Sequence, residues 1–574
     1  MADVGISIKE GVANGASPFK DPSMRNVGLL GMFTRGPKLV PTKVSNMEEF
    51  NEMFGGQNSN YFGPAVVKNL FDEAGEAPVT LYLSRVVSAD SVVASKELSA
   101  TTAVTLQCKA GYKGTPDPGA WANDKVNLTF YPFGVYADEK YALAVSYNGS
   151  TETYIAGTIA EIVSQVNTAS KCITVAMNGT EETGNARYKV TSVGSFTARQ
   201  GDTQLTGSAA PTGAAAGDTL YSASYEKIGV VASVSGNNIL LQGMALVGVS
   251  GTVSKLTGTL VTGTLTGGTD GNVTEDYFGD QFNSFDGADV QIMAHTEYHS
   301  LDVEKKFNAY LNEQKSPIGV ITFPVDFSES MAELYYNALR SNDKSFMAGG
   351  YEGWITVLDS DGNRVTIPNI GAVIGAAYLR TPYASGNYIH IPPGGLDSLF
   401  TTVVDVTPRS FTQATINRLV QNYLCNVLQY VEDTGWYVGT SRSYSTNSLY
   451  QSIHTRLQTS YYVRVLKNKL RFMEQKPNTP SIRQEALVEL RTYFKGEYDA
   501  GALENSVAFD KAYQAICDKS NNPAGQDRKL VNITVMWIPT ECIESVVLSL
   551  QRNDGILLSL ETEKCCTISF SRPL

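Results

Sequence analysis

The strongest constraint on the fold is a change of pattern inside the chain, between about residues 101 and 275. This stretch is rich in Thr, Ser, Gly, Val and Ala, and its apolar residues alternate with polar ones, as in half-buried strands. Turn signals such as Asn148-Gly149 interrupt it, whereas the segments on both sides combine strand and helix patterns. The sequence therefore predicts an inserted all-β domain in an α/β multidomain chain, whose 574 residues allow about four domains.

The flanking segments, residues 23–100 and 276–410, alternate strands with helices. The first contains an apolar strand at residues 27–33, a helix whose cap we assign to Ser45, and a strand at residues 79–87. In the second we expect strands at residues 290–294 and 318–323 and helices at 302–314 and 331–340, the last opened by a capping box of Ser330 and Glu333. Strands separated by helices of this length predict a largely parallel sheet with right-handed crossovers.

The last third, residues 411–555, is more helical. Apolar residues recur at i, i+3, i+4 and i+7 through residues 412–431, which predicts a core-facing helix. A second helix is expected at residues 448–475, and a third begins at cap Thr479 with Pro480 in its first position. Strands are expected at residues 530–538 and 542–550. The pattern predicts a helical C-terminal domain.

Both ends of the chain, residues 1–22 and 556–574, resemble spare strands. A lone strand cannot satisfy its own backbone groups, so each arm must fold back on its own body or pair with another chain. We therefore expect strand exchange between subunits. The apolar residues of these arms are Val4, Ile6, Ile8, Val12, Ile556, Leu558, Ile568 and Phe570.

Charge and composition exclude several classes of protein. The 45 Lys and Arg against 57 Asp and Glu leave a net charge of −12, which repels phosphate and argues against a nucleic-acid coat. The N-terminus lacks a secretory signal pattern and no apolar run is long enough to span a membrane, so a soluble chain made in a cytoplasm is expected. The seven cysteines form no CxxC pair, which favours free thiols.

Few residues suggest chemistry. His295 and His299 are four apart with Glu297 between them, but HTEYH is not the HExxH order of zinc proteases and no third ligand is evident. The acidic turn that begins at Asp359 lacks the glycine and the final Glu of a calcium loop. Walker A, GxSxG and GxGxxG patterns are absent. The sequence predicts no catalytic residue, no metal and no cofactor.

A basic stretch stands out in this acidic chain, between Arg464 and Lys495. It is either a solvated helix face or, because its sign opposes that of the whole chain, a docking face for an acidic partner. On the second interpretation the contact residues are Lys467, Lys469, Arg471, Lys476 and Arg483.

Segments in this order resemble the contractile tail sheath family, which includes the sheaths of contractile-tailed phages, R-type pyocins, contractile injection systems and type VI secretion. Near the N-terminus the resemblance is carried by LLGMFTRGP, SNMEEFNEMFGG and VTLYLSRVV. In the middle it is carried by IPNIGAVIGAAYLRTPYASGNYIHIPPGG and GWYVGTSRSYS. FMEQKPNTPSIRQEALVEL and LVNITVMWIPTECIESVVLSLQR carry it near the end.

The resemblance implies a structural subunit that polymerises helically, in stacked six-membered rings, around an inner tube. Contraction would then drive the tube through a target envelope without nucleotide. The implied partners are further copies, the tube protein, the baseplate and the tail terminator, with no direct nucleic acid and no membrane insertion. The C-terminal domain would form the inner wall, with the basic residues facing the tube and the insert outside.

The implied location is a virion tail assembled in a host bacterial cytoplasm. A bacterial contractile injection system or type VI-like device is the first alternative. An enzyme built on the βαβ core, or a virion surface binding protein that works through its insert, is the second.

Overall fold

A largely parallel sheet, in which β2 alone pairs antiparallel with its neighbour β3, forms the centre of the molecule in the computed structural model. The structure describes residues 23, 25–100, 103–133, 140–180, 189–224, 226–257, 261–315, 317–341, 345–359, 362–386, 388–408, 411–523 and 529–542. The sheet has the order β19-β18-β1-β3-β2, and β1 pairs in parallel with both β3 and β18. Its strands are β1 (Asn26–Gly31), β2 (Thr42–Val44), β3 (Thr80–Arg85), β18 (Ile292–His295) and β19 (Ile318–Gly319). The predicted parallel pairing is confirmed.

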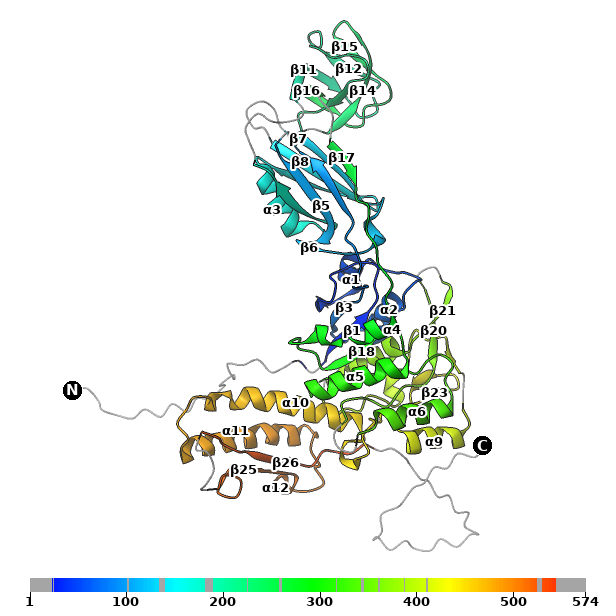
Figure 1. Cartoon of the computed structure of the whole chain (residues 1–574), viewed down its shortest axis with the longest axis vertical. Coiled ribbons are helices and arrows are strands. Elements are labelled where there is room, and N and C mark those ends of the chain that lie inside the picture. The colour runs from blue at the N-terminus through cyan, green and yellow to red at the C-terminus, as the bar shows by residue number, and fades with distance from the viewer. Residues whose placement is uncertain are drawn as a thin grey trace, which may run out of the picture.

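Helices cover this sheet because their apolar stripes face it (Figure 1). Phe50 and Phe54 of the first helix and Leu70 of the second belong to the same buried cluster as the strand residues Val27 and Leu29. We call the sheet with its helices the central body. The helices are α1 (Met47–Phe54), α2 (Gly63–Ala74), α4 (Glu275–Gly279), α5 (Leu301–Gln314), α6 (Glu329–Leu339) and α9 (Gln413–Tyr423).

Two helix caps differ from the sequence prediction. α1 is capped by the side chain of Asn46 and not by Ser45, and α6 is capped by Ser328 instead of Ser330. In both cases a residue of equal capping ability occupies the extended position directly before the helix.

A glycine-rich helical run packs tightly on α2 in the central body. It consists of α7 (Ile370–Ala372), the π-helix η3 (Val373–Arg380) and α8 (Thr381–Ala384). A Cβ atom at Gly371 would lie 2.5 Å from the carbonyl oxygen of Val66, and one at Gly375 would lie 2.6 Å from that of Leu70. Glycine is therefore required for this close approach. Beside the run lies a small sheet of β20 (Trp354–Leu358), β21 (Arg364–Ile367) and β22 (Asp405–Thr407).

The insert extends from one end of the central body (Figure 1). It contains a sheet of β10-β5-β4 with β6 beside β5, a sheet of β17-β7-β8-β9, and a closed barrel of β11-β12-β15-β14-β13-β16. The barrel is itself inserted between β10 and β17. The strands are β4 (Ser95–Ser99), β5 (Thr105–Tyr112), β6 (Thr115–Pro116), β7 (Asn127–Phe133), β8 (Lys140–Tyr147), β9 (Ser150–Ala156), β10 (Ile173–Asn178), β11 (Lys189–Ala198), β12 (Gln204–Gly207), β13 (Thr219–Tyr221), β14 (Lys227–Ser235), β15 (Asn238–Leu241), β16 (Val249–Thr257) and β17 (Val261–Thr264).

The prediction that the insert is all-β is wrong, because the insert contains the helix α3 (Ile159–Ala169) and a short 3-10 helix, η1 (Ala120–Ala122). Thr158 and Glu161 form a capping box at the start of α3, and Ile162 and Val166 face the core of the insert. The outgoing and returning segments of the insert also meet, because Val92 and Thr269 form a β-bridge close to the central body. β4 precedes the border predicted at residue 101 yet pairs with β5, so we count it with the insert.

The helix predicted at residues 412–431 is only half present. α9 ends at Tyr423, Leu424 adopts a left-handed conformation with φ 53°, and the remaining residues form β23 (Leu428–Val431), which pairs with β24 (Gly435–Val438). The apolar residues of β23 happen to lie at positions that continue the helical spacing of α9, so the pattern predicted one longer helix.

The C-terminal part, here called the helical unit, projects sideways from the central body (Figure 1). Thr479 caps α11 as predicted, with Pro480 in its first position. The helical unit contains α10 (Ile453–Lys469), η6 (Leu470–Met473), α11 (Pro480–Asp499), α12 (Phe509–Ala512), β25 (Tyr513–Ile516) and β26 (Thr534–Trp537).

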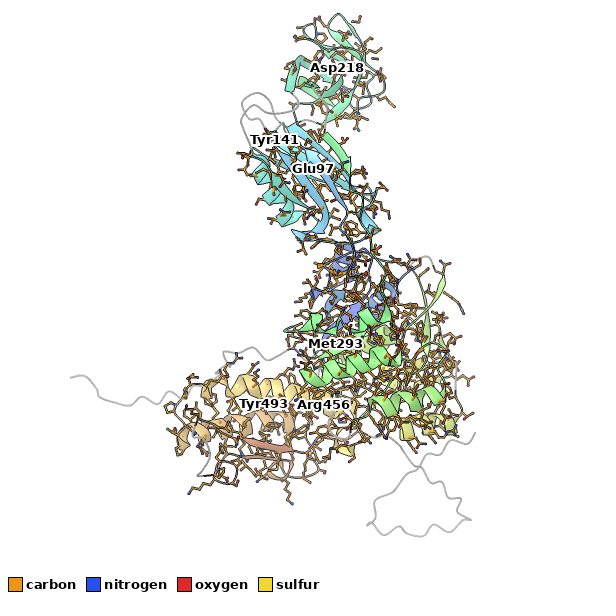
Figure 2. All side chains as sticks on the ribbon, viewed as in Figure 1. Glu97, Tyr141, Asp218, Met293, Arg456 and Tyr493 are labelled. Carbon is orange, nitrogen blue, oxygen red and sulfur yellow. The ribbon has the colours of Figure 1, made fainter. Side chains whose placement is uncertain are left out.

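Figure 2 marks the barrel by Asp218, the central body by Met293 and the helical unit by Tyr493. No helix among the described residues is both long enough and apolar enough to cross a membrane.

Candidate assembly surface

The helical unit has a hydrophobic cluster of its own. Tyr462 of α10 packs edge-to-face on Phe494 of α11 with ring centroids 5.1 Å apart, and on Trp537 of β26 at 5.0 Å. Leu490 and Leu503 complete the buried centre. Since the two helices and the hairpin pack on one another, the unit presents surfaces that are separate from those of the central body.

Two of the predicted basic residues line a hollow, and the other three contact side chains within the unit. Lys467 and Arg471 are exposed and line a hollow of about 740 Å³ between the helical unit and the start of the central body, together with Arg464. Arg464 donates to the backbone oxygen of Ser23 at 2.8 Å and lies 3.3 Å from the Asp289 carboxylate. The hollow therefore concentrates positive charge near the point where the N-terminal arm leaves the body.

The other basic residues engage neighbours within the unit. Lys469 is 18% exposed, forms a 3.1 Å ion pair with Glu489 and lies over the ring of Tyr493. Arg483 donates to the side chain of Asn478 at 2.8 Å, and Lys476 lies over the ring of Phe472. Of the five predicted residues, Lys467 and Arg471 are the two that line the hollow.

The hairpin of β25 and β26 offers open sheet edges. Tyr513 pairs with Trp537 and Ile516 with Thr534, and within the described part of the chain each strand has one strand neighbour. Open edges present N–H and C=O groups that can accept another strand. The apolar arm residues predicted for strand exchange, Val4, Ile6, Ile8, Val12, Ile556, Leu558, Ile568 and Phe570, lie outside the described residues.

One residue that the sequence analysis missed joins the insert to the central body. Arg85, at the end of β3, is fully buried, and its guanidinium donates to Asp117 of the insert at 2.7 Å. It also donates to the backbone oxygens of Phe33 and Gly36, and it lies 3.5 Å from the Asp270 carboxylate. The sequence signal was an arginine inside the apolar strand predicted at residues 79–87, where a buried charge requires a partner.

The comparisons with known proteins agree with this architecture. No protein-family model matches the sequence, and no curated protein sequence matches it. The structure is similar to that of a sheath tail protein from Listeria innocua, with 13% identity, a TM-score of 0.52, and 91% of this chain and 97% of the other covered.

Two further similarities have lower scores. One is to a sheath tail protein from Desulfitobacterium hafniense, with 13% identity and a TM-score of 0.47 over 91% of this chain and 99% of the other. The other is to the helical sheath of the anti-feeding prophage in its contracted state, with 16% identity and a TM-score of 0.39 over 52% and 79%. The similarity to the Listeria innocua protein shows that the chain has the fold of a sheath tail protein, as its resemblance to the contractile sheath family predicts.

Proposed function

We propose that the chain is the structural subunit of a contractile tail sheath, which polymerises helically around an inner tube and contracts to drive that tube through an envelope. The observation that carries this proposal is the shared fold, which extends over 91% of the chain and 97% of the Listeria innocua sheath tail protein. A heterologous contact repeated by rotation and translation builds a tube rather than a closed oligomer. This role requires no enzymatic step.

Strand addition supplies the contact between subunits in this proposal. Each arm would add to an open edge of the hairpin formed by β25 and β26 in a neighbour, at a net gain of about 1 kcal/mol for each hydrogen bond. The rest of each arm then acts as a tether, so that the bodies can shift while neighbouring subunits stay linked. That property suits a sheath that changes length.

Deletion of residues 1–20 tests this linkage. We expect folded protein that no longer forms tubes in negative-stain electron microscopy, because the donated strand is gone. A matched control removes the barrel, from Lys189 to Thr257, and should still form tubes, since this barrel is a closed sheet far from the helical unit. Unchanged tubes after the arm deletion would contradict the proposal.

We further propose that the helical unit forms the inner wall and that the insert lies outside. Lys467 and Arg471 would then face an acidic tube protein. Exposed ion pairs contribute only about 0.2–1 kcal/mol each, so tube binding relies on repetition around the ring and weakens as salt rises. The baseplate and the tail terminator would contact the two ends of the tube-filled sheath.

Charge reversal of both residues, Lys467→Glu with Arg471→Glu, tests the tube-facing surface. We expect sheath-only polymers to form normally while co-assembly with tubes is lost. Lys113→Glu, in the insert, is the control and should leave co-assembly intact. Tube-filled particles from the double variant would show that this surface points elsewhere.

We propose that the sheath belongs to the tail of a phage virion, with a bacterial contractile injection system as the alternative. Particles isolated from the producing bacterium should then carry a DNA-filled head, and electron microscopy with nuclease-protection measurements checks this. Headless particles would identify an injection device instead.

A further inference from the structure

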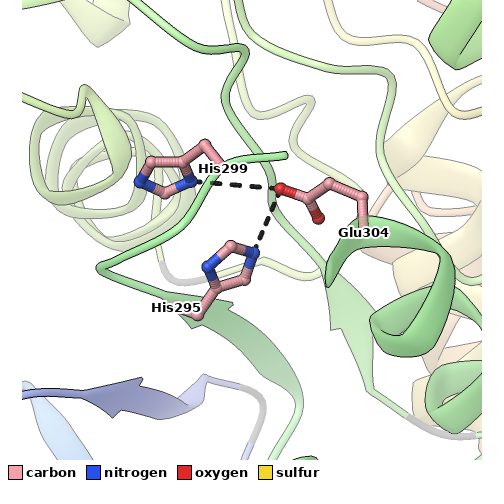
Figure 3. A group of neighbouring side chains, drawn as sticks. All are labelled: His295, His299 and Glu304. Atoms are coloured by element: carbon pink, nitrogen blue, oxygen red, sulfur yellow. Dashed lines mark hydrogen bonds and ion pairs between the residues drawn. The ribbon is translucent and has the colours of Figure 1, made fainter. Parts of the chain in front are cut away.

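Three side chains meet in the interior of the central body, away from every surface considered above. His295 ends β18, His299 lies in the following loop, and Glu304 lies in the first turns of α5 (Figure 3). Glu304 Oε1 is 3.1 Å from His295 Nε2 and 3.9 Å from His299 Nδ1. One ligand atom from each residue lies within 4.8 Å of the others, and all three residues are buried. The sequence showed the two histidines but not the third residue.

The hydrogen bonds of His295 fix where its lone pair points. Its Nδ1 lies 2.8 Å from the backbone carbonyl oxygen of Glu297. Since a carbonyl oxygen only accepts, Nδ1 carries the proton, and Nε2 of the neutral ring carries the lone pair. That lone pair faces the Glu304 carboxylate at 3.1 Å. Two acceptors at this distance require a cation between them, either a proton or a metal ion.

His299 distinguishes these two cations. Among the described residues, neither ring nitrogen of His299 has a hydrogen-bond partner within 3.5 Å, and the second oxygen of Glu304 also has none. Its 3.9 Å separation from Glu304 is too long for a hydrogen bond. A proton shared by His295 and Glu304 leaves these buried polar atoms unsatisfied, which is costly. One metal ion would engage all three side chains together.

We propose that His295, His299 and Glu304 bind a divalent transition-metal ion, with zinc the preferred one. Two imidazole nitrogens and one carboxylate oxygen form a zinc ligand set that leaves a fourth position for water. Ligand bonds of about 2.0–2.1 Å in a tetrahedral arrangement separate the ligand atoms by about 3.3 Å. The observed spacings, from 3.1 Å to at most 4.8 Å, lie within about 1.5 Å of that value.

The surroundings support a metal ion at this position. The Nδ1–H of His295 donates to a backbone carbonyl, which is the contact that orients metal-ligating histidines. Aromatic rings of Phe278, Phe282 and Phe307 pack around His295, and Trp354 packs against His299. These rings restrict solvent and hold both imidazoles in place.

The metal ion would have a structural role, because its ligands come from both a strand and a helix. It would join the end of β18 to α5 across the loop in which Glu297 accepts hydrogen bonds from the backbone amides of Phe62 and Gly63 at the start of α2. One ion would therefore fix the positions of a strand and two helices of the central body.

Metal analysis of the full-length, untagged chain tests the proposal. After expression with zinc and extensive dialysis, we expect one zinc per chain by mass spectrometry, and a tetrahedral absorption spectrum when cobalt replaces zinc. His299→Gln and Glu304→Gln should each lower the zinc content at least tenfold. His454→Gln alters another buried histidine, which bonds Ser452 and the Thr540 carbonyl, and should retain the zinc.

A thermal measurement separates the site from the folding of its variants. In the unmodified chain, a strong chelator should lower the melting temperature, and zinc should restore it. Wild-type protein without metal above background, or with a melting temperature unaffected by the chelator, would overturn the proposal and leave a proton shared by His295 and Glu304. Both outcomes are independent of tube formation.

Discussion

The ion pair between Arg85 and Asp117 should decide how firmly the insert is held to the central body. Asp117→Asn keeps the size of the side chain and an acceptor oxygen but removes the charge that faces the guanidinium. Arg85 has no exposed surface and Asp117 is 2% exposed, so water cannot replace the lost contact. Burial raises the pKa of Asp117 to about 6 although Arg85 opposes the shift, so the comparison is made at about pH 8, where the wild-type carboxylate is ionised. The raised pKa means that the folded chain bears a desolvation cost for this charge, and this cost offsets part of the ion pair that Asp117→Asn removes.

The free-energy cost expected for Asp117→Asn follows from the contacts that Arg85 keeps in the variant. Removing one partner of a buried ion pair costs about 3–5 kcal/mol. Arg85 keeps its backbone acceptors, among them the oxygens of Phe33 and Pro118, and the Asp270 carboxylate stays 3.5 Å away. We therefore expect the lower end of this range, about 3 kcal/mol, which is roughly a hundredfold change in the local opening equilibrium.

Hydrogen exchange followed by mass spectrometry measures this opening in the intact chain. The amide of Gly36 donates to Asp117 at 2.7 Å, so peptides containing Gly36 should exchange about a hundredfold faster in the variant. Asp218→Asn is the matched control, because its 2.7 Å ion pair with Lys255 is partly exposed and should contribute less than about 1 kcal/mol. If Asp117→Asn and Asp218→Asn accelerate hydrogen exchange equally in the peptides around each substituted residue, the reasoning is refuted.

Two further substitutions probe the central body. Burial raises the pKa of Glu352 to about 8, so the folded chain retains a proton that the unfolded chain releases above its ordinary pKa of 4.5. The free energy of unfolding should then fall by up to about 1.4 kcal/mol per pH unit between about pH 5 and 8. Denaturant titrations of Glu352→Gln should show that its free energy of unfolding depends less on pH. The same pH dependence in the variant and the wild type would contradict this. Gly375→Ala should cost about 1–3 kcal/mol, because the new Cβ meets the Leu70 carbonyl oxygen, whereas Gly496→Ala, with open space around it, should gain about 0.5–1 kcal/mol. Equal melting temperatures for the two alanine variants would count against the close contact of α2 with η3.

The elements that the sequence predicts well are those with a local cause. α11 begins at Thr479 because a capping side chain and Pro480 act within one turn. The parallel sheet was predictable from short apolar runs separated by helices. α3 was missed although its Thr158 and Glu161 capping box was present, because the Thr-rich and Ser-rich composition around it favoured strands.

Other features depend on contacts that periodicity does not contain. Leu424 breaks the helix predicted at residues 412–431, and the residues after it pair with β24 instead. Glu304 joins His295 and His299 only because a loop turns α5 back toward the end of β18. The contacts of the basic residues likewise depend on the tertiary structure: Lys467 and Arg471 line the hollow, whereas Lys469 forms an ion pair with Glu489 of α11.

The bridge between Val92 and Thr269 has a consequence for the order of folding. β3 ends at residue 85 and β18 begins at residue 292, so their common sheet cannot close until the insert has left the ribosome. Once the insert has folded and its two connecting segments have met, the effective loop shortens from about 200 to about 30 residues, which reduces the entropy cost of closure by about 2 kcal/mol. The insert should therefore fold during synthesis before the central sheet closes, and its folding should bring β18 close to β1.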